Sequence, residues 1–505
     1  MKITIDSIKK TKETKEIKKI KEEISEFYIQ TFSLLFFPED NIFGNNSASE
    51  NYIKIFTDKR EDFIDISLSI CYNKKTVDKY LSVLFNNNKK LLLDIGKLFY
   101  EAAGELTGLY PPWGIHTGIR PAKIAGELLE KNNYDEDKVN LILREDYLMN
   151  KNKALLAIET YKNGLGSNCV SLSDSDFSLY ISIPFCPTRC KYCSFVSFST
   201  TGLLKLIPEY IKKLVGETEL IGKITKDLNL SLKSVYIGGG TPTTLDCESL
   251  EIILNAVKNN FDMTECIEYT VECGRADTIT QNKLELLKNF GVGRISVNPQ
   301  TLNDDILRKI GRNHTSGDFF KAFELAKSSG IKNINTDCII GLPGESEESM
   351  IKTIKTLSEI KPGNITVHTF CVKKSSEFKI KINNDNTDEN IYMPDAPELN
   401  SALEIGYDIL KNAGYKPYYM YKQKYSAGNL ENTGFCLTDC ECLYNIYMMD
   451  ELQTIFGVGA GAVTKLVKNG RIERVANYKY PYEYIERDFQ INRDINRDKL
   501  KILEG

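Results

Sequence analysis

The most informative stretch of the chain is Leu179-Tyr-Ile-Ser-Ile-Pro-Phe-Cys-Pro-Thr-Arg-Cys-Lys-Tyr-Cys193. An apolar, β-rich run ends here at three thiols, Cys186, Cys190 and Cys193, which are spaced as CxxxCxxC. Three thiolates on one loop can hold three irons of a 4Fe-4S cluster and leave the fourth iron without a protein ligand. The spacing therefore predicts a cluster with one iron open to another molecule.

A structural zinc site is the main alternative for these thiols. Zinc usually takes four ligands in two pairs, whereas this trio has no neighbouring cysteine pair or histidine. The whole chain contains three histidines, His116, His314 and His368. Disulfides are not expected, because the N-terminus does not read as a secretory signal and thiols stay reduced in the cytosol. The spacing thus favours the cluster.

The length and composition predict an ordinary soluble protein of two or three domains. The chain has 505 residues, of which 42% are hydrophobic and 27% charged, with a net charge of -4. This charge predicts no general binding of nucleic acid, and no apolar run approaches the roughly 18 residues that span a membrane. We therefore expect a cytoplasmic protein. A Gly-, Ser- and Asp-rich stretch at 163–178 predicts a linker, and we expect domains at 1–170, 171–395 and 396–505.

After this linker, β-rich runs alternate with helical patterns, as in parallel βα units. Six runs are expected as strands: Leu179–Phe185, Ser234–Ile237, Ile267–Cys273, Arg294–Val297, Asn333–Leu342 and Ile365–Val372. Polar or chemically reactive residues follow most of these runs. The C-terminal ends of parallel barrel strands converge on one mouth, whereas a doubly wound sheet gathers ligands at its switch point. We therefore predict an α/β fold with a partial (β/α)6 barrel, an N-terminal α/β domain and a C-terminal α+β extension.

Several residues that follow the expected strands carry groups that could contact a ligand. The run Gly238-Gly-Gly-Thr-Pro-Thr243 would let a ligand approach the backbone closely, although it could also be a simple tight turn. Glu272 can pair with an ammonium group, or can lie exposed to solvent. Arg312 can grip a carboxylate in bidentate fashion, and Asp337 can accept hydrogen bonds from ribose hydroxyls.

The cysteine motif, preceded by Tyr180-x-x-x-Pro184-Phe185, resembles the radical S-adenosylmethionine (SAM) superfamily. The resemblance implies that SAM chelates the fourth iron through its amino and carboxylate groups. It makes Tyr180 and the three cysteines catalytic, and the cysteines cluster ligands. It also implies a cofactor-binding set that comprises Tyr180, Phe185, Gly239, Gly240, Thr241, Glu272, Gln300, Arg312 and Asp337.

Segments at 112–121, 366–375, 418–424 and 428–434 resemble the HemZ-like branch of the oxygen-independent coproporphyrinogen III oxidases (dehydrogenases) over nearly the whole chain. The spacings between Gln300, Arg312 and Asp337 match the same family. The implied reaction splits SAM to a 5′-deoxyadenosyl radical, which removes a hydrogen from a propionate β-carbon. Loss of carbon dioxide and an electron leaves a vinyl group, and two rounds give protoporphyrinogen IX. The implied partners are a porphyrinogen, an electron donor and an electron acceptor.

A substrate with four propionates would need cations around a flat apolar face. We therefore predict substrate contacts from a mixed set of cationic and aromatic residues: Arg120, Trp113, Lys374, Tyr421 and Lys424. Two of these positions have a simpler interpretation. Trp113 can merely anchor the N-terminal domain, and the tyrosine-rich stretch around Tyr421 can be a core strand.

Two departures from the oxidases leave other functions open. Phe195 stands where they carry a fourth cysteine, and Ser182 stands where they carry a histidine. Relatives thought to carry haem share both departures, so a haem chaperone or a haem-degrading radical SAM enzyme is the alternative. A long N-terminal extension argues against the chaperone.

A second group of cysteines and a glycine run complete the candidate motifs. Cys436, Cys440 and Cys442 are interpreted as incidental rather than as ligands of an auxiliary cluster. The run Gly457–Gly461 lacks the βαβ frame of a dinucleotide site, and we expect a turn that lines the substrate mouth.

Overall fold

The structure is a computed structural model that describes residues 2–7, 26–37, 51–60, 62–85, 88–165, 172–193, 199, 201–371, 395–423 and 426–487. The chain forms two compact units. The first comprises Met1–Ile158 with Lys422–Leu430, and the second comprises Glu159–Tyr421 with Glu431–Gly505. The three-domain division expected from the sequence stays a prediction.

The first unit contains a four-stranded sheet in the order β1-β2-β3-β4. Strand β1 pairs with β2 in parallel, and the other neighbours are antiparallel. The core lies between this sheet and helices α2 and α3, where Phe32, Phe99 and Ile66 are buried. The N-terminal α/β character is thereby confirmed. Its elements are β1 (Lys2–Ser7), α2 (Glu26–Phe36), β2 (Tyr52–Arg60), β3 (Phe63–Tyr72), β4 (Lys75–Leu84), α3 (Asn88–Thr107), α4 (Pro121–Lys131) and α5 (Glu136–Glu145). Helix α6 (Lys151–Gly164) continues into the second unit.

The second unit is built on an 11-stranded sheet in the order β11-β12-β10-β9-β8-β7-β6-β5-β13-β14-β15. Six of these strands, β5 to β10, are parallel neighbours. The sheet stays open at both edges, and the predicted partial barrel is confirmed. The parallel strands are β5 (Asp176–Ile183), β6 (Ser231–Gly239), β7 (Glu268–Glu272), β8 (Arg294–Ser296), β9 (Asn333–Ile340) and β10 (Asn364–Thr369).

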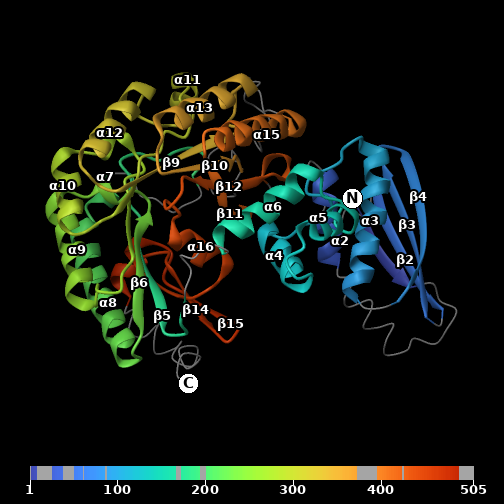
Figure 1. Ribbon diagram of the computed structural model, residues 1–505, viewed down its shortest axis with the longest axis horizontal. Coiled ribbons are helices and arrows are strands. Elements are labelled where there is room, and N and C mark those ends of the chain that lie inside the picture. Colours follow the sequence, from blue (N-terminus) through green and yellow to red (C-terminus); the bar gives the residue numbers. More distant parts are fainter. Residues whose placement is uncertain are drawn as a thin grey trace. The chain divides into compact units, whose positions relative to one another are not determined.

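Helices cover the outer side of these strands (Figure 1). They form because apolar residues recur at three- and four-residue spacing, as in α8, where Tyr210, Leu214 and Ile221 are buried. Polar caps start several of them; the Asp246 side chain, for instance, accepts a hydrogen bond from the Ser249 backbone. The helices are α7 (Thr201–Leu204), α8 (Ile207–Asp227), α9 (Cys247–Asn260), α10 (Gln281–Asn289), α11 (Asp304–Lys309), α12 (Ser316–Ser328), α13 (Glu347–Ile360) and α15 (Ala396–Asn412).

The C-terminal extension lengthens the barrel sheet at both edges. Strand β12 pairs antiparallel with β10, whereas β13 pairs in parallel with β5 and continues into a hairpin of β14 and β15. The elements are β11 (Lys416–Lys422), β12 (Glu431–Cys436), α16 (Leu443–Asp450), β13 (Thr454–Val458), β14 (Val463–Lys468), β15 (Arg471–Ala476) and α17 (Pro481–Glu486). No helix in the described ranges is both long enough and apolar enough to cross a lipid bilayer.

A fully buried carboxylate holds the extension to the barrel. Glu217 of α8 accepts hydrogen bonds from the Gly459 backbone (2.8 Å), the Asn477 side chain (2.9 and 3.1 Å) and the Tyr484 hydroxyl (2.8 Å). Gly459 lies in the turn between β13 and β14 with φ +96°, where glycine is favoured. The glycine run is therefore a hairpin turn and starts no helix of a dinucleotide site.

Replacing Glu217 by Ala is expected to destabilise the protein by about 2–4 kcal/mol, because several buried donors lose their acceptor. Chemical denaturation followed by circular dichroism measures this change. Glu219→Ala, an exposed position on the same helix, is the control and is expected to stay within about 0.5 kcal/mol of the wild type. Equal stability of the two variants would contradict this account of the extension.

Candidate functional site

The cysteine loop and the glycine run are joined by backbone hydrogen bonds at the C-terminal ends of β5 and β6. The Gly240 N–H donates to the Ile183 carbonyl and the Thr241 N–H donates to the Phe185 carbonyl, both at 2.8 Å. A Cβ at position 240 would lie 2.6 Å from the Phe185 oxygen. Glycine is therefore required there for the two segments to approach.

This contact fixes the residues that precede and include the first thiol. The Phe185 ring is fully buried and lies edge-on against Tyr210, with 5.2 Å between ring centroids. The Cys186 sulfur lies 3.5 Å from the Thr241 hydroxyl. The structure thus brings together Phe185, Cys186 and Thr241, three residues that the sequence analysis assigned to one site.

Two buried guanidinium groups face the rest of the cysteine loop. Arg275 donates to the Thr188 carbonyl at 3.2 Å and lies 3.6 Å from the Cys190 sulfur. Arg312 donates to the Tyr192 hydroxyl at 3.1 Å and to the Gly274 carbonyl at 3.0 Å. Both terminal nitrogens of Arg312 therefore have protein partners, while its buried Nε has no hydrogen bond.

The donor set fits an iron-sulfur cluster in its chemistry. It offers three thiols on one loop, none of them in a disulfide, and the nearby guanidinium groups would offset thiolate charge. Within the described ranges, no three or more His, Cys, Asp or Glu side chains are gathered so that they could hold a metal ion. Cluster ligation by Cys186, Cys190 and Cys193 therefore stays a prediction that rests on residue type and spacing.

Glu272, at the end of β7, lies directly beside the glycine run. Its Oε1 accepts from the Tyr236 hydroxyl at 2.5 Å, and its Oε2 accepts from the Gly239 N–H at 3.2 Å. Burial raises the pKa of Glu272 to about 7, and the nearby Asp337 acts in the same direction, whereas both hydrogen bonds oppose the shift. Glu272, Gly239 and Gly240 thus form one group of predicted cofactor residues.

Asp337 belongs to a second polar group on β9 and β10. Its carboxylate accepts from the Asn298 side chain at 2.8 Å and lies 3.8 Å from the His368 ring nitrogen Nε2. The other ring nitrogen of His368 lies 3.4 Å from the Tyr421 hydroxyl. The predicted ribose ligand and the predicted substrate tyrosine are therefore linked through His368.

Gln300 has an unusual backbone conformation, with φ +70°. Its N–H donates to the Asp337 carbonyl at 3.1 Å, and its own carbonyl accepts from Ile339 at 2.8 Å. Its buried side-chain oxygen has no hydrogen-bond partner. A non-glycine residue in the left-handed region and an unsatisfied buried oxygen are features that cluster at binding sites.

Tyr180 lies on β5, two strands away from Glu272 on β7, and is part of a group of packed tyrosines. Its ring packs against Tyr236 and Tyr444, with 6.2 and 6.1 Å between centroids. Burial raises the pKa of the Tyr180 hydroxyl well above its usual range.

The remaining predicted substrate residues are less informative. Trp113 is fully buried in the first unit beneath the Lys422 ammonium, which favours the anchoring role. Arg120 is half-buried at the start of α4 in the same unit. Lys374 and Lys424 lie outside the described residues, as does Phe195. Substrate contact by all of these residues stays a prediction.

The second cysteine group lies at the opposite, N-terminal edge of the parallel strands. The carbonyls of Cys440 and Glu441 accept from Arg294, the first residue of β8. Cys442 is fully buried and its thiol donates to Glu268, the first residue of β7. This placement agrees with an incidental role in packing.

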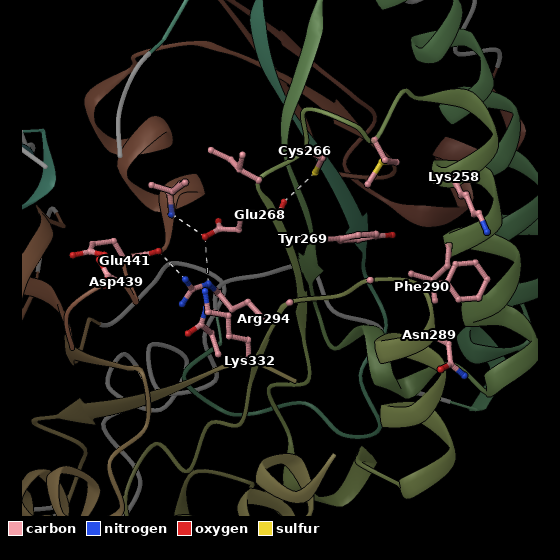
Figure 2. A pocket seen from close by; sticks show the side chains of 17 residues that line it. Lys258, Cys266, Glu268, Tyr269, Asn289, Phe290, Arg294, Lys332, Asp439 and Glu441 are labelled. Atoms are coloured by element: carbon pink, nitrogen blue, oxygen red, sulfur yellow. Dashed lines mark hydrogen bonds and ion pairs between the residues drawn. The ribbon is translucent and has the colours of Figure 1, made fainter. Parts of the chain in front are cut away.

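A pocket of about 600 Å³ opens at the same N-terminal edge. Figure 2 shows the ion pair of Glu268 and Arg294 in its wall, with Lys258 and Phe290 toward the other side. None of the predicted cofactor residues lines it. In parallel barrels this end of the strands usually serves stability, so the pocket is not taken as the active site.

Three residues that were assigned no role from the sequence join the site: Arg275, Tyr236 and His368. Arg275 follows Glu272 by three residues, and Tyr236 precedes the glycine run on its strand. Their positions near strand ends were a usable signal. Their contacts depend on neighbouring strands and could not be read from one segment.

Comparisons with known proteins agree with this arrangement. The model of the radical SAM superfamily matches residues 180–357. The oxygen-independent coproporphyrinogen-III oxidase-like protein HemZ of Bacillus subtilis is 36% identical, over 79% of this chain and 78% of that protein. The heme chaperone HemW of Lactococcus lactis is 31% identical, over 56% of this chain and 68% of that protein.

The fold has a solved counterpart. The structure of coproporphyrinogen III oxidase HemN from Escherichia coli matches with a TM-score of 0.50 at 21% identity, over 65% of this chain and 76% of that chain. This likeness supports the partial barrel alone. The HemZ match, with the match to the superfamily model, shows that the chain belongs to the HemZ-like branch of the oxygen-independent coproporphyrinogen III oxidase family, within the radical SAM superfamily.

Proposed function

We propose that this protein decarboxylates propionates of coproporphyrinogen III to vinyl groups, giving protoporphyrinogen IX. Membership of the radical SAM superfamily implies a 4Fe-4S cluster and SAM as cofactors. The observation that carries the finer proposal is the 36% identity with the HemZ protein, which extends over four fifths of both chains. When bound, the cofactors supply a carbon-centred radical that removes a hydrogen from the propionate β-carbon.

The protein's share of this reaction is binding, orientation and charge. Glu272 would receive the ammonium group of SAM, since both of its oxygens are held by donors on β6. Asp337 would accept from the ribose hydroxyls while Asn298 fixes its carboxylate. Arg312 donates from one terminal nitrogen to Gly274 and from the other to Tyr192, and each of these nitrogens keeps a second N–H for a carboxylate. Its buried, unpartnered Nε is a further donor.

A haem chaperone is the second candidate. The HemW relative supports it, and so does one structural observation. Of the three histidines, His116 and His314 are buried, whereas the His368 side chain is 25% exposed and lies beside Tyr421. Imidazole and phenol oxygens are common axial ligands of haem iron. His368 is therefore the histidine best placed to bind haem.

The main proposal predicts that the anaerobically reconstituted protein, given SAM, a reductant and coproporphyrinogen III, releases carbon dioxide and forms 5′-deoxyadenosine. Chromatography of the tetrapyrroles and trapping of carbon dioxide measure the reaction. We expect Cys190→Ser to lose the visible iron-sulfur absorption and both products. Cys266→Ser is the matched control, because this thiol lies in the pocket at the N-terminal end of β7. Deoxyadenosine without decarboxylation would overturn the proposed substrate.

Gly240→Ala is expected to lower the iron content and turnover, because the added Cβ forces the segment before Cys186 away from the glycine run. Overpacking of this kind costs about 1–3 kcal/mol. Iron analysis after reconstitution measures the effect. Gly293→Ala adds a Cβ with no heavy atom within 4 Å and is the control. Equal iron content in both variants would show that this close approach does not matter.

The second candidate predicts that one equivalent of haem gives a Soret band that His368→Ala shifts or removes, since the iron would lose its imidazole ligand. Absorption spectroscopy checks this. His314→Gln, at a buried ring, should leave the band unchanged. A stoichiometric complex with the same band in His368→Ala argues against this ligand.

A further inference from the structure

We propose that Tyr236 is a positioning residue that holds the Glu272 carboxylate in place for the ammonium group of SAM. This inference rests on the proposed function, because it takes Glu272 to contact SAM. Tyr236 lies inside β6, three residues before Gly239, and is not itself expected to touch the cofactor. It would act through Glu272.

The hydrogen bonds fix the plane of the carboxylate. The Tyr236 hydroxyl donates to Oε1 at 2.5 Å, and the Gly239 N–H donates to Oε2 at 3.2 Å. Each oxygen therefore has one protein donor and keeps a further lone pair for a ligand. An ammonium group could then meet a carboxylate whose orientation is already set.

The ring of Tyr236 has little freedom to move this hydroxyl away. It packs against Tyr180, at 6.2 Å and 26° between ring planes, and against Tyr444, at 4.4 Å and 23°, and these two rings also pack against each other. Tyr180 and Tyr236 are also in register on neighbouring strands. Turning the ring would disrupt two stacked contacts at once.

The glycine run leaves the space that this arrangement needs. A Cβ at Gly238 would lie 2.7 Å from Glu272 Oε2 and 2.9 Å from the Tyr236 ring. Position 238 therefore accommodates the carboxylate and the tyrosine together. The glycines serve both the backbone contact with the cysteine loop and the placement of Glu272.

Several titratable groups surround Glu272. They come from the strands on both sides, from α16 and from the adjoining residue: Tyr180, Tyr236, Cys273, Asp337 and Tyr444. Burial raises the pKa of Glu272 to about 7, and the Tyr236 hydrogen bond lowers it. Loss of that bond would raise the pKa further, so the carboxylate would form only at higher pH.

The test compares wild type, Tyr236→Phe and Tyr444→Phe in the reconstituted protein. Both variants remove one hydroxyl from the same group of tyrosines, but the hydrogen bond to Glu272 Oε1 comes from Tyr236. SAM affinity is measured by calorimetry from pH 6 to 9. For Tyr236→Phe we expect the affinity for SAM at pH 7 to be about tenfold or more below that of the wild type. The fall of this affinity toward low pH should begin about one pH unit higher than in the wild type. Titration of SAM itself is common to all three proteins.

A second readout does not need the cofactor. The infrared carbonyl band of protonated Glu272, assigned by its loss in Glu272→Gln, should titrate near pH 7 in the wild type and at higher pH in Tyr236→Phe. Unchanged affinity and an unchanged band in Tyr236→Phe would overturn the inference. Equal shifts in Tyr444→Phe would also overturn it, because the stack rather than the hydrogen bond would then be responsible. A wild type that fails to bind SAM contradicts the proposed function instead, and the infrared band still tests the role of Tyr236.

Discussion

The close backbone approach between the ends of β5 and β6 is the constraint on which the site depends. Two hydrogen bonds of 2.8 Å join Gly240 and Thr241 to Ile183 and Phe185. They place the start of the cysteine loop, and the same glycine run carries the N–H that holds Glu272. A side chain at Gly240 would collide with the backbone of the cysteine loop, and a side chain at Gly238 would collide with the Glu272 carboxylate. One short segment therefore sets the positions of the thiols and of the carboxylate.

The two ends of the barrel strands are stabilised in different ways. At the N-terminal ends, Arg294 and Glu268 form a buried ion pair at 3.3 Å. Such a pair is costly to bury unless its other hydrogen-bonding groups are satisfied. Backbone groups of the loop at 440–444 supply these partners. At the C-terminal ends, Gln300 and Arg312 keep buried atoms without a hydrogen bond, and so do Arg294 and Asn364 at the N-terminal ends. Unsatisfied buried atoms therefore do not by themselves distinguish the end where a cofactor is predicted.

The sequence predicted much of the barrel because its signals are local. Each of the six parallel strands was expected within a few residues of its observed bounds, since a short apolar run followed by a helical pattern specifies a βα unit by itself. The C-terminal extension was harder. Strands β12 and β13 join opposite edges of one sheet, and pairing between segments so distant in sequence leaves no local pattern. Tyr236 was missed for the same reason, because its partner Glu272 lies on another strand.

The serine at position 182 shows how a departure from the oxidases is built into the packing. Its hydroxyl donates to the Ala460 carbonyl at 2.8 Å, and its own carbonyl accepts from Tyr210 at 2.7 Å. The Ala460 N–H donates to the same tyrosine hydroxyl at 2.9 Å. A histidine at 182 would need the space now taken by the turn at Ala460 and by Gly239, which lies close to the serine hydroxyl. Because Glu217 anchors that turn through Gly459, a histidine at position 182 would disturb the packing of the extension. Ser182 therefore belongs to a hydrogen-bond network that includes Tyr210, Ala460 and Glu217.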